Sequence, residues 1–318
     1  MKEFDESAAE AARARQAELT KPPGSLGRLE ELAVFMAGWQ GRARPRIERA
    51  QALVFAGNHG VTAQGVNPFP AEVTAQMVRN FERGGAAINQ LCAQAGAELS
   101  VVALDLDRPS GDFTRGMALE VADLVASIQT GKDAVDPRAD VILLGEMGIG
   151  NSTVAAALAA ATFGGEAADW VGPGTGASDE IMANKLRAVD AGLRRHKGAA
   201  TAASILGSFG GREQAAICGA VIRARELGIP VILDGFICTA AAGVLMVNDR
   251  NALEHCLIGH QSAETGHRRL IAAMGKEPVV TLDMRLGEGT GAAVALLILR
   301  AALACHDGMA TFAEAGIG

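Results

Sequence analysis

Short, continuous apolar segments recur along the chain from residue 50 onward, and they constrain the fold more than any other feature of the sequence. Longer stretches rich in Ala, Leu, Gln and Arg, a composition typical of helices, separate them. Uninterrupted apolar strands that alternate with helices are typical of a parallel sheet buried on both faces. The sequence therefore predicts an α/β fold: a doubly wound, mostly parallel sheet with helices on both faces. The segments expected to be strands are 52–56, 99–104, 141–144, 170–171, 230–233 and 279–282.

The two ends of the chain are predicted to form a smaller helical lobe. Residues 1–20 are rich in Ala, Glu and Arg, and the prolines at 22 and 23 must end a helix there because proline lacks the amide donor. A second helix is expected from Arg28 to about Gln40. We predict an N-terminal helical part at 1–45, an α/β nucleotide- and base-binding domain at 46–290, and a C-terminal helix at 291–318 that completes the lobe.

Composition excludes several classes of protein. The net charge is −7, no basic tract is present, and aromatics make up 4% of the 318 residues, so a nucleic-acid partner is not expected. The five cysteines are scattered and never spaced as CxxC, which favours a reduced, cytoplasmic protein without a zinc site. The longest apolar run, 292–305, contains Arg300 and is interpreted as a buried helix, so no membrane span and no signal peptide are predicted.

Glycine-rich polar loops follow the predicted strands. In a parallel α/β sheet, ligands bind beyond the carboxyl ends of the strands, so these loops are expected to converge on one site. The loops are 57–60, 145–153, 172–176, 234–236 and 283–291.

The loop 145–153 carries the clearest physical signal. Glycines allow the backbone to approach an anion, and Asn151, Ser152 and Thr153 open a helix whose free amides and dipole favour negative charge. The loop matches neither GxxxxGK[ST] nor GxGxxG. It either binds phosphate or is a tight capped turn. Lys185, on a following helix, either completes a phosphate site or is an exposed helical lysine.

Two carboxylates stand where packing alone does not require them. Glu288 lies in a glycine-rich loop before an apolar helix, and Glu146 directly follows an apolar strand. The helix start and Arg285 would lower the pKa of Glu288, whereas burial in a pocket would raise it. Glu288 is therefore a candidate general base, with a helix cap as the alternative.

Other polar residues in these loops have competing interpretations. His59 is more readily explained as a structural histidine than as a catalytic residue or metal ligand. Asp234 and Asp283 either bind ribose hydroxyls or cap loops, and Ser262 resembles a capping residue before a helix that runs to about Met274.

Several long motifs, in a fixed order over nearly the whole chain, resemble the nicotinate-nucleotide–dimethylbenzimidazole phosphoribosyltransferase family, which makes α-ribazole 5′-phosphate for the lower ligand of cobalamin. The motifs are KPPGSLGRLE from Lys21, NHGV from Asn58, FPAEVTAQMVRNFERGGAAIN from Phe69, GEMGIGNST from Gly145, LDGF from Leu233, HQSAETGH from His260 and MRLGEGTGAA from Met284.

The resemblance implies a homodimer that moves the 5-phosphoribosyl group of nicotinate mononucleotide to 5,6-dimethylbenzimidazole, with release of nicotinate and inversion at C1′. It implies that Glu288 is the general base and that Glu146 lies in the site. It places Ser262 near the nicotinate and the ribose. It places Arg285 in the same motif as the general base Glu288. No cofactor and no metal are expected, because a pyridinium ring already leaves readily. The implied phosphate site comprises Gly148, Asn151, Ser152, Thr153 and Lys185.

A flat, apolar acceptor needs an apolar slot. We expect its walls to come from Met77, Met284 and Leu286, near the segment that begins at Phe69. Three alternatives remain for the whole chain. A phosphoribosyl hydrolase or phosphorylase would keep the fold, a nucleotide-binding protein would not consume the nucleotide, and a dehydrogenase is disfavoured by the missing GxGxxG.

Overall fold

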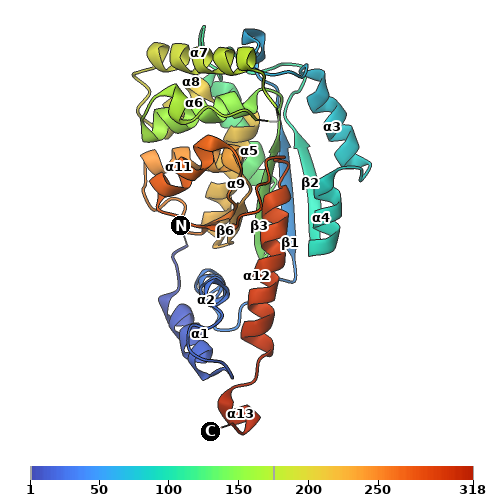
Figure 1. The fold of residues 1–318 in the computed structure, drawn as a ribbon, viewed down its shortest axis with the longest axis vertical. Helices are drawn as coiled ribbons and strands as arrows, with labels where there is room; N and C mark the ends of the chain where they lie inside the picture. Colours follow the sequence, from blue (N-terminus) through green and yellow to red (C-terminus); the bar gives the residue numbers. More distant parts are fainter. Residues whose placement is uncertain (1, 175, 318) are drawn as a thin grey trace.

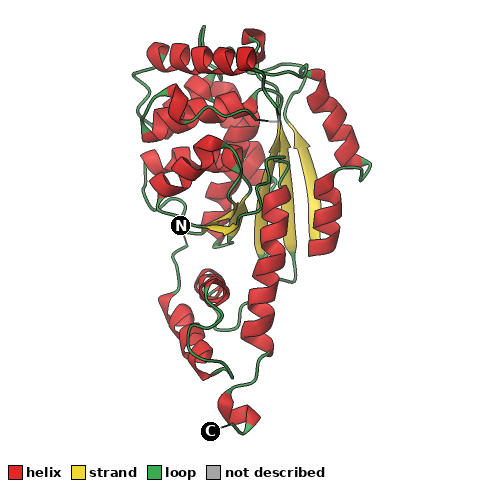
Figure 2. Cartoon of the chain, viewed as in Figure 1, coloured by secondary structure: helices red, strands yellow, loops and turns green. Residues whose placement is uncertain are grey.

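A six-stranded sheet, parallel throughout the described part of the chain, forms the centre of the computed structural model, which describes residues 2–174 and 176–317. The strand order is β2-β1-β3-β4-β5-β6, and helices surround the sheet (Figure 2). The α/β prediction is confirmed. The strands are β1 (Ala50–Ala56), β2 (Ala97–Ala103), β3 (Val141–Met147), β4 (Val231–Leu233), β5 (Cys256–His260) and β6 (Pro278–Val280).

Alternate residues of the central strands enter two separate hydrophobic cores, which is why these strands are apolar without interruption. On β3, Ile142 and Leu144 pack into one core, while Val141 and Leu143 pack into the other. All four side chains are buried. Both faces of the sheet must therefore be covered by helices.

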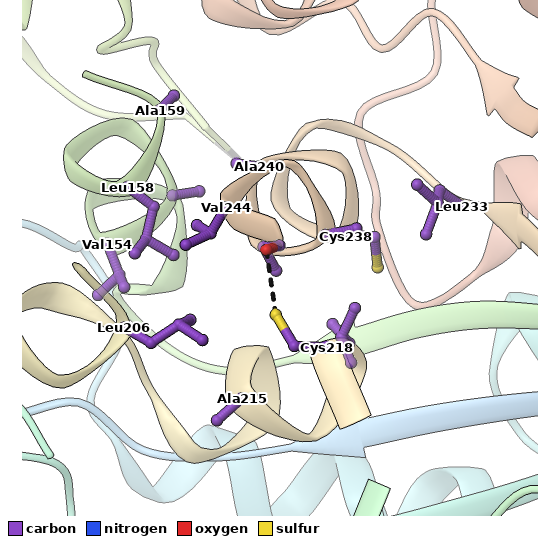
Figure 3. Close-up of a cluster of buried hydrophobic side chains, with 14 of the residues drawn as sticks. Val154, Leu158, Ala159, Leu206, Ala215, Cys218, Leu233, Cys238, Ala240 and Val244 are labelled. Carbon is purple, nitrogen blue, oxygen red and sulfur yellow. Dashed lines mark hydrogen bonds between the residues drawn. The ribbon is translucent and has the colours of Figure 1, made fainter. Parts of the chain in front are cut away.

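The larger core lies under the helices that follow β2, β3, β4 and β5. Figure 3 shows Leu158 and Val244 facing each other above Cys218, whose thiol donates a hydrogen bond to the carbonyl of Ala241 at 3.2 Å. Small alanines on these helices allow close packing. The helices are α5 (Val121–Asp133), α6 (Asn151–Phe163), α7 (Asp179–Arg195), α8 (Ala202–Phe209), α9 (Arg212–Leu227), α10 (Phe236–Gly243) and α11 (Thr265–Met274).

The opposite face is covered by α3 (Glu72–Glu82), α4 (Ala87–Ala95) and α12 (Thr290–Gly308). The helices α1 (Glu6–Glu18), α2 (Arg28–Gln40) and α13 (Phe312–Ala315) lie beyond one end of the sheet, near the far end of α12 (Figure 1). Helix α12 contacts both the sheet and α2. By length and composition it could cross a membrane, and 50% of its apolar window is buried in the fold. The division of the chain at 45 and 290 stays a prediction.

One strand prediction is wrong, and one strand was missed. Trp170 and Val171 are buried but form no strand; they follow the short helix η2 (Ala167–Asp169), and the Trp170 indole donates to the Gly164 carbonyl at 2.9 Å. Their apolar character reflects burial alone. The sequence also failed to predict β5, because its apolar residues are few and histidines flank them at His255 and His260. Strand β3 continues to Met147, so Glu146 belongs to the strand and not to the following loop.

Candidate active site

A cavity lies at the carboxyl ends of the strands, next to the point where the strand order reverses between β1 and β3. Loops that follow separate strands meet there, as expected for a ligand site in an α/β sheet. The predicted loop 172–176 contributes Pro173 and Gly174, although no strand precedes it, whereas Thr175 lies outside the described residues. The lining comes from 66–68, the end of β3 and the start of α6, residues 173, 174 and 177, 234–237, residues 260, 262 and 264, and 285–287.

One wall of the cavity suits an anion. It is formed by the first residues of α6, including Ser152, and by Lys185 of α7. The Lys185 ammonium donates to Ser152 Oγ at 3.1 Å and to the Gly172 carbonyl at 2.9 Å. Only 3% of Lys185 is exposed, so the interpretation of an exposed helical lysine is wrong. Burial lowers the pKa of Lys185, and the negative charge of Glu264 opposes that shift.

Glu146 forms part of the adjoining wall. It pairs with Phe55 in the register of β1 and β3, and its carboxyl accepts a hydrogen bond from the Asn151 side-chain amide. Burial raises the pKa of Glu146 to about 8, and the negative charges of Asp234 and Glu213 act in the same direction. This carboxyl therefore carries a proton at neutral pH.

Glu288 lies in a tight turn directly before α12. Gly287, Glu288 and Gly289 all have positive φ, at +83°, +64° and +85°. The two glycines adopt this conformation at little cost, while Glu288 needs support from its surroundings. The turn also packs on the backbone of Gly145, where a Cβ would lie 2.5 Å from the Gly289 nitrogen. Glycine is therefore required at 145 for the turn to approach the sheet.

Asp234, at the end of β4, supports this turn. Its carboxylate accepts the backbone N–H of Gly289 at 3.1 Å and that of Ala292 at 3.0 Å. Of the two roles considered for Asp234, the structure shows the cap. Burial raises the pKa of Glu288 to about 7, with a further contribution from the negative charge of Asp234. The sequence left open whether the helix start and Arg285 would lower the pKa of Glu288 or burial would raise it; in the structure, burial raises it.

Ser262 is held at the cavity by a buried histidine. Its N–H donates to His267 Nδ1 at 2.9 Å, and His267 Nε2 lies 3.2 Å from Thr239 Oγ1. Nδ1 is therefore unprotonated and Nε2 carries the hydrogen. Burial lowers the pKa of His267 to about 3, so this imidazole stays neutral at physiological pH.

His59 forms a fully buried pair with Glu213, in agreement with its interpretation as a structural histidine. Nε2 of His59 lies 2.9 Å from Oε1 of Glu213, and neither side chain is exposed to solvent. Across the ranges 2–174 and 176–317, no cluster of three or more His, Cys, Asp or Glu residues is suited to hold a metal ion.

The structure brings most of the predicted site residues to the cavity lining: Glu146, Gly148, Asn151, Ser152, Lys185, Ser262, Arg285 and Leu286. Thr153 is buried outside the lining, and Met77 packs against the core on the α12 face of the sheet. Phe69 is 49% exposed and lies just beyond Asn67 and Pro68, which do line the cavity. Glu288 is buried beside the lining residue Gly287.

The sequence did not single out Glu264 or His260, which also line the cavity. His260 belongs to the strand that the sequence failed to predict, and its Nε2 lies 3.9 Å from Asp234. Glu264 stands in the HQSAETGH segment, between a serine and a helix start, where an acid is easily taken for a cap. A spacing pattern could have found neither residue, because Asp234, which lies near His260, and Lys185, whose pKa is affected by the charge of Glu264, are distant in sequence.

Known proteins match the chain over almost its whole length. A family model described as Phosphoribosyltransferase matches residues 1–317. This chain belongs to that phosphoribosyltransferase family. A nicotinate-nucleotide–dimethylbenzimidazole phosphoribosyltransferase of Rhodobacter capsulatus is 60% identical to it, over 98% of this chain and 93% of the other. The protein of the same name from Ruegeria pomeroyi is 58% identical over the same shares.

A solved structure agrees with this family assignment. The crystal structure of the correspondingly named phosphoribosyltransferase from Thermus thermophilus has a TM-score of 0.91 and 38% identity, covering 99% of each chain. The resemblance drawn from the sequence motifs is thereby confirmed. The chain is a phosphoribosyltransferase enzyme, and the cavity described above is its candidate active site.

Proposed function

We propose that this phosphoribosyltransferase transfers the 5-phosphoribosyl group of nicotinate mononucleotide to 5,6-dimethylbenzimidazole, releasing nicotinate and forming α-ribazole 5′-phosphate, in the assembly of the cobalamin nucleotide loop. The names of its relatives support these substrates. The observation that carries the proposal is the placement of Glu288. A buried carboxyl with a pKa of about 7 stands beside a cavity whose other wall offers Lys185 and the start of α6 to an anion.

The phosphate of the donor is assigned to the wall formed by Gly148, Asn151, Ser152 and Lys185. An ammonium and a helix N-terminus both favour a phosphate, and Lys185 is already oriented by Ser152 and Gly172. Thr153 can contribute through its helical position only, since its side chain is buried away from the cavity lining. Arg285 lines the same cavity and supplies a further positive charge.

The acceptor is activated by Glu288. One ring nitrogen of the benzimidazole attacks C1′ with its lone pair as the bond from C1′ to the nicotinate nitrogen breaks, and that electron pair neutralises the pyridinium. Attack from the opposite face inverts C1′ from β to α. The other ring nitrogen gives its proton to the Glu288 carboxylate. A base with a pKa of about 7 is matched to this task at neutral pH.

Glu146 lines the cavity in which this proton transfer is proposed to occur. Its raised pKa keeps it protonated at neutral pH, so it presents a hydrogen-bond donor and no second negative charge to the cavity. A pair of carboxyls with separate protonation states is a common arrangement in acid–base sites. Leu286, half exposed at the lining, and the neighbouring Phe69 provide apolar surface for the flat acceptor.

The test is product analysis by mass spectrometry with nicotinate mononucleotide, with and without 5,6-dimethylbenzimidazole. We expect α-ribazole 5′-phosphate and nicotinate in equal amounts only when the acceptor is present. Release of nicotinate without acceptor would identify a hydrolase, and binding without turnover would identify a nucleotide-binding protein.

The remaining predictions belong to the same proposal. The enzyme acts as a homodimer in the cytoplasm, with its helical lobe formed by 1–45 and 291–318 and its substrates bound by 46–290. The five cysteines are free, which suits a reducing compartment. Analytical ultracentrifugation tests the dimer.

A further inference from the structure

Glu264 is a buried acid that no step of the reaction above uses. We propose that its carboxylate binds the ribose hydroxyls of the nucleotide donor and thereby selects ribosyl over deoxyribosyl substrates. The inference rests on the proposed function, since it takes nicotinate mononucleotide as the donor.

Glu264 lines the cavity, and its buried carboxylate has no hydrogen-bond partner within the described part of the protein. Glu264 precedes the first residue of α11, lines the cavity and is only 8% exposed. Neither carboxylate oxygen has a hydrogen-bond partner among residues 2–174 and 176–317. The Gly174 amide approaches the carboxyl without reaching hydrogen-bond geometry. The backbone N–H of Glu264 donates to Ser262 Oγ at 3.3 Å, which fixes the main chain here.

Asp234 and Glu146, the other acids among the lining residues, differ from Glu264 in this respect. Asp234 accepts two backbone N–H groups, and Glu146 accepts the Asn151 amide. A buried polar group without a partner is costly, and the cost is larger for a charge. An acceptor left free at a cavity wall is therefore best explained by a hydrogen-bond donor that arrives with the ligand.

The chemistry of the donor substrate identifies those hydrogen-bond donors. In nicotinate mononucleotide the phosphate and the ring carboxylate are ionised at neutral pH, and the pyridinium nitrogen carries no hydrogen. Only the 2′- and 3′-hydroxyls of the ribose can donate. A carboxylate has two acceptor oxygens and matches two neighbouring hydroxyls. The N–H of the acceptor base is already assigned to Glu288.

The position of Glu264 also fits a ribose. Its negative charge acts on Lys185, the cation of the anion-binding wall, and it stands two residues from Ser262, which also lines the cavity. In a 5-phosphoribosyl group the sugar directly adjoins the phosphate, so a carboxylate next to the phosphate wall meets the sugar. The competing explanation is that Glu264 serves only as the counter-ion of Lys185, and the experiment must separate the two.

The experiment measures dissociation constants by calorimetry for nicotinate mononucleotide and its 2′-deoxy and 3′-deoxy analogues, without acceptor. Binding is measured in place of turnover because removing the 2′-hydroxyl also changes the reactivity of C1′. Wild-type protein, Glu264→Ala and Glu264→Gln are compared, with Glu277→Gln, an exposed acid beyond the end of α11, as the control. Circular dichroism verifies that each variant is folded.

We expect the wild type to bind at least one deoxy analogue about 10- to 100-fold more weakly than the parent, the usual effect of a hydrogen bond to a charged group. In Glu264→Ala this penalty should fall below about threefold, because each deletion removes the same interaction. Glu264→Gln keeps one acceptor oxygen, so its penalty should lie between those of the wild type and Glu264→Ala. The penalty in Glu277→Gln should match that of the wild type.

Two results would overturn the proposal. One is an equal penalty for the deoxy analogues in the wild type and in Glu264→Ala, including the case where neither protein discriminates. The other is a change in the dissociation constant that Glu264→Ala causes equally for all three ligands and that disappears when Lys185 is replaced by Met. That result would identify Glu264 as a counter-ion of Lys185. Neither result depends on turnover, so a failure of the proposed reaction would be seen separately in the product analysis of the wild type.

Discussion

The Asp234 carboxylate accepts a hydrogen bond from the Gly289 N–H at 3.1 Å, at the peptide that directly follows Glu288. A second bond, from the Ala292 N–H at 3.0 Å, fixes the start of α12 to the end of β4. Asp234 therefore holds the left-handed turn that carries Glu288. Burial raises the pKa of Glu288, and the charge of Asp234 adds to that shift. One buried side chain thus positions the proposed general base and adds to its basicity.

Replacement of the proposed base is the most direct test of the mechanism. Glu288→Gln should lower kcat by about 10²- to 10⁴-fold, the usual contribution of general base catalysis. The dissociation constant of nicotinate mononucleotide should change little, since the phosphate wall is untouched. Steady-state kinetics and calorimetry measure the two effects. Unchanged turnover would show that another group accepts the proton.

The pH dependence of turnover should report the ionisation of Glu288. Because the base acts as a carboxylate, kcat should rise with pH through an apparent pKa near 7. Asp234→Asn removes a negative charge that raises this pKa, so the rise should move to lower pH. Glu146 and His260 also face Asp234, and the midpoint belongs to the group as a whole. A midpoint that stays in place, or moves upward, in Asp234→Asn would contradict this electrostatic role.

The sequence predicted the architecture because apolar periodicity reports burial. Strands β1 and β3 are apolar without interruption and were found, whereas β5 was missed because histidines bound its short apolar run. The segment 170–171 shows the reverse error: Trp170 is buried in the core without belonging to the sheet. Burial can be inferred from composition, but whether a buried segment pairs as a strand depends on neighbours that the local sequence does not specify.

For the site, motifs located the loops but not the contacts between them. The anion wall and Lys185 follow from recognisable loops and helix starts, and the structure brings them together. The hydrogen bond from the Gly289 N–H to Asp234 joins segments far apart in the chain, and so does the pair of His59 with Glu213. Met77 was expected in the acceptor wall, yet it packs against the core, because its helical position faces the sheet. The direction in which such a side chain points depends on the fold and cannot be predicted from the local sequence.

Glu146 should make the unliganded enzyme less stable as the pH rises. Its pKa in the folded protein is about 8, above the ordinary value of 4.5, so the protonated form is favoured by folding. The stability it contributes is present below about pH 4.5 and is lost as the pH rises through 8, by an amount on the order of 5 kcal/mol. Glu146→Gln should therefore unfold at a higher temperature than the wild type at pH 8 and at a similar one at pH 5. A difference in thermal unfolding that does not vary with pH would exclude this effect.

Lys185 should contribute to donor binding through its charge. Lys185→Met keeps the length of the side chain and should raise the dissociation constant of nicotinate mononucleotide about 10- to 100-fold, as expected for the loss of a charged hydrogen bond. Arg187→Met, an exposed substitution on the same helix, serves as the matched control. Calorimetry at two salt concentrations measures both variants. If the two substitutions weaken nucleotide binding equally, Lys185 acts only through the overall electrostatic field of the protein.

The pair formed by His59 and Glu213 should behave as a unit in stability measurements. Both side chains are fully buried 2.9 Å apart, so removal of one leaves the other without its partner. His59→Gln and Glu213→Gln should each lower the free energy of unfolding by about 3 to 5 kcal/mol, the usual cost of breaking a buried pair. The double variant should lose less than the sum of the single losses, because neither residue is then left without its partner. Urea unfolding of the four proteins measures the coupling, and additive losses would show that the two residues contribute independently.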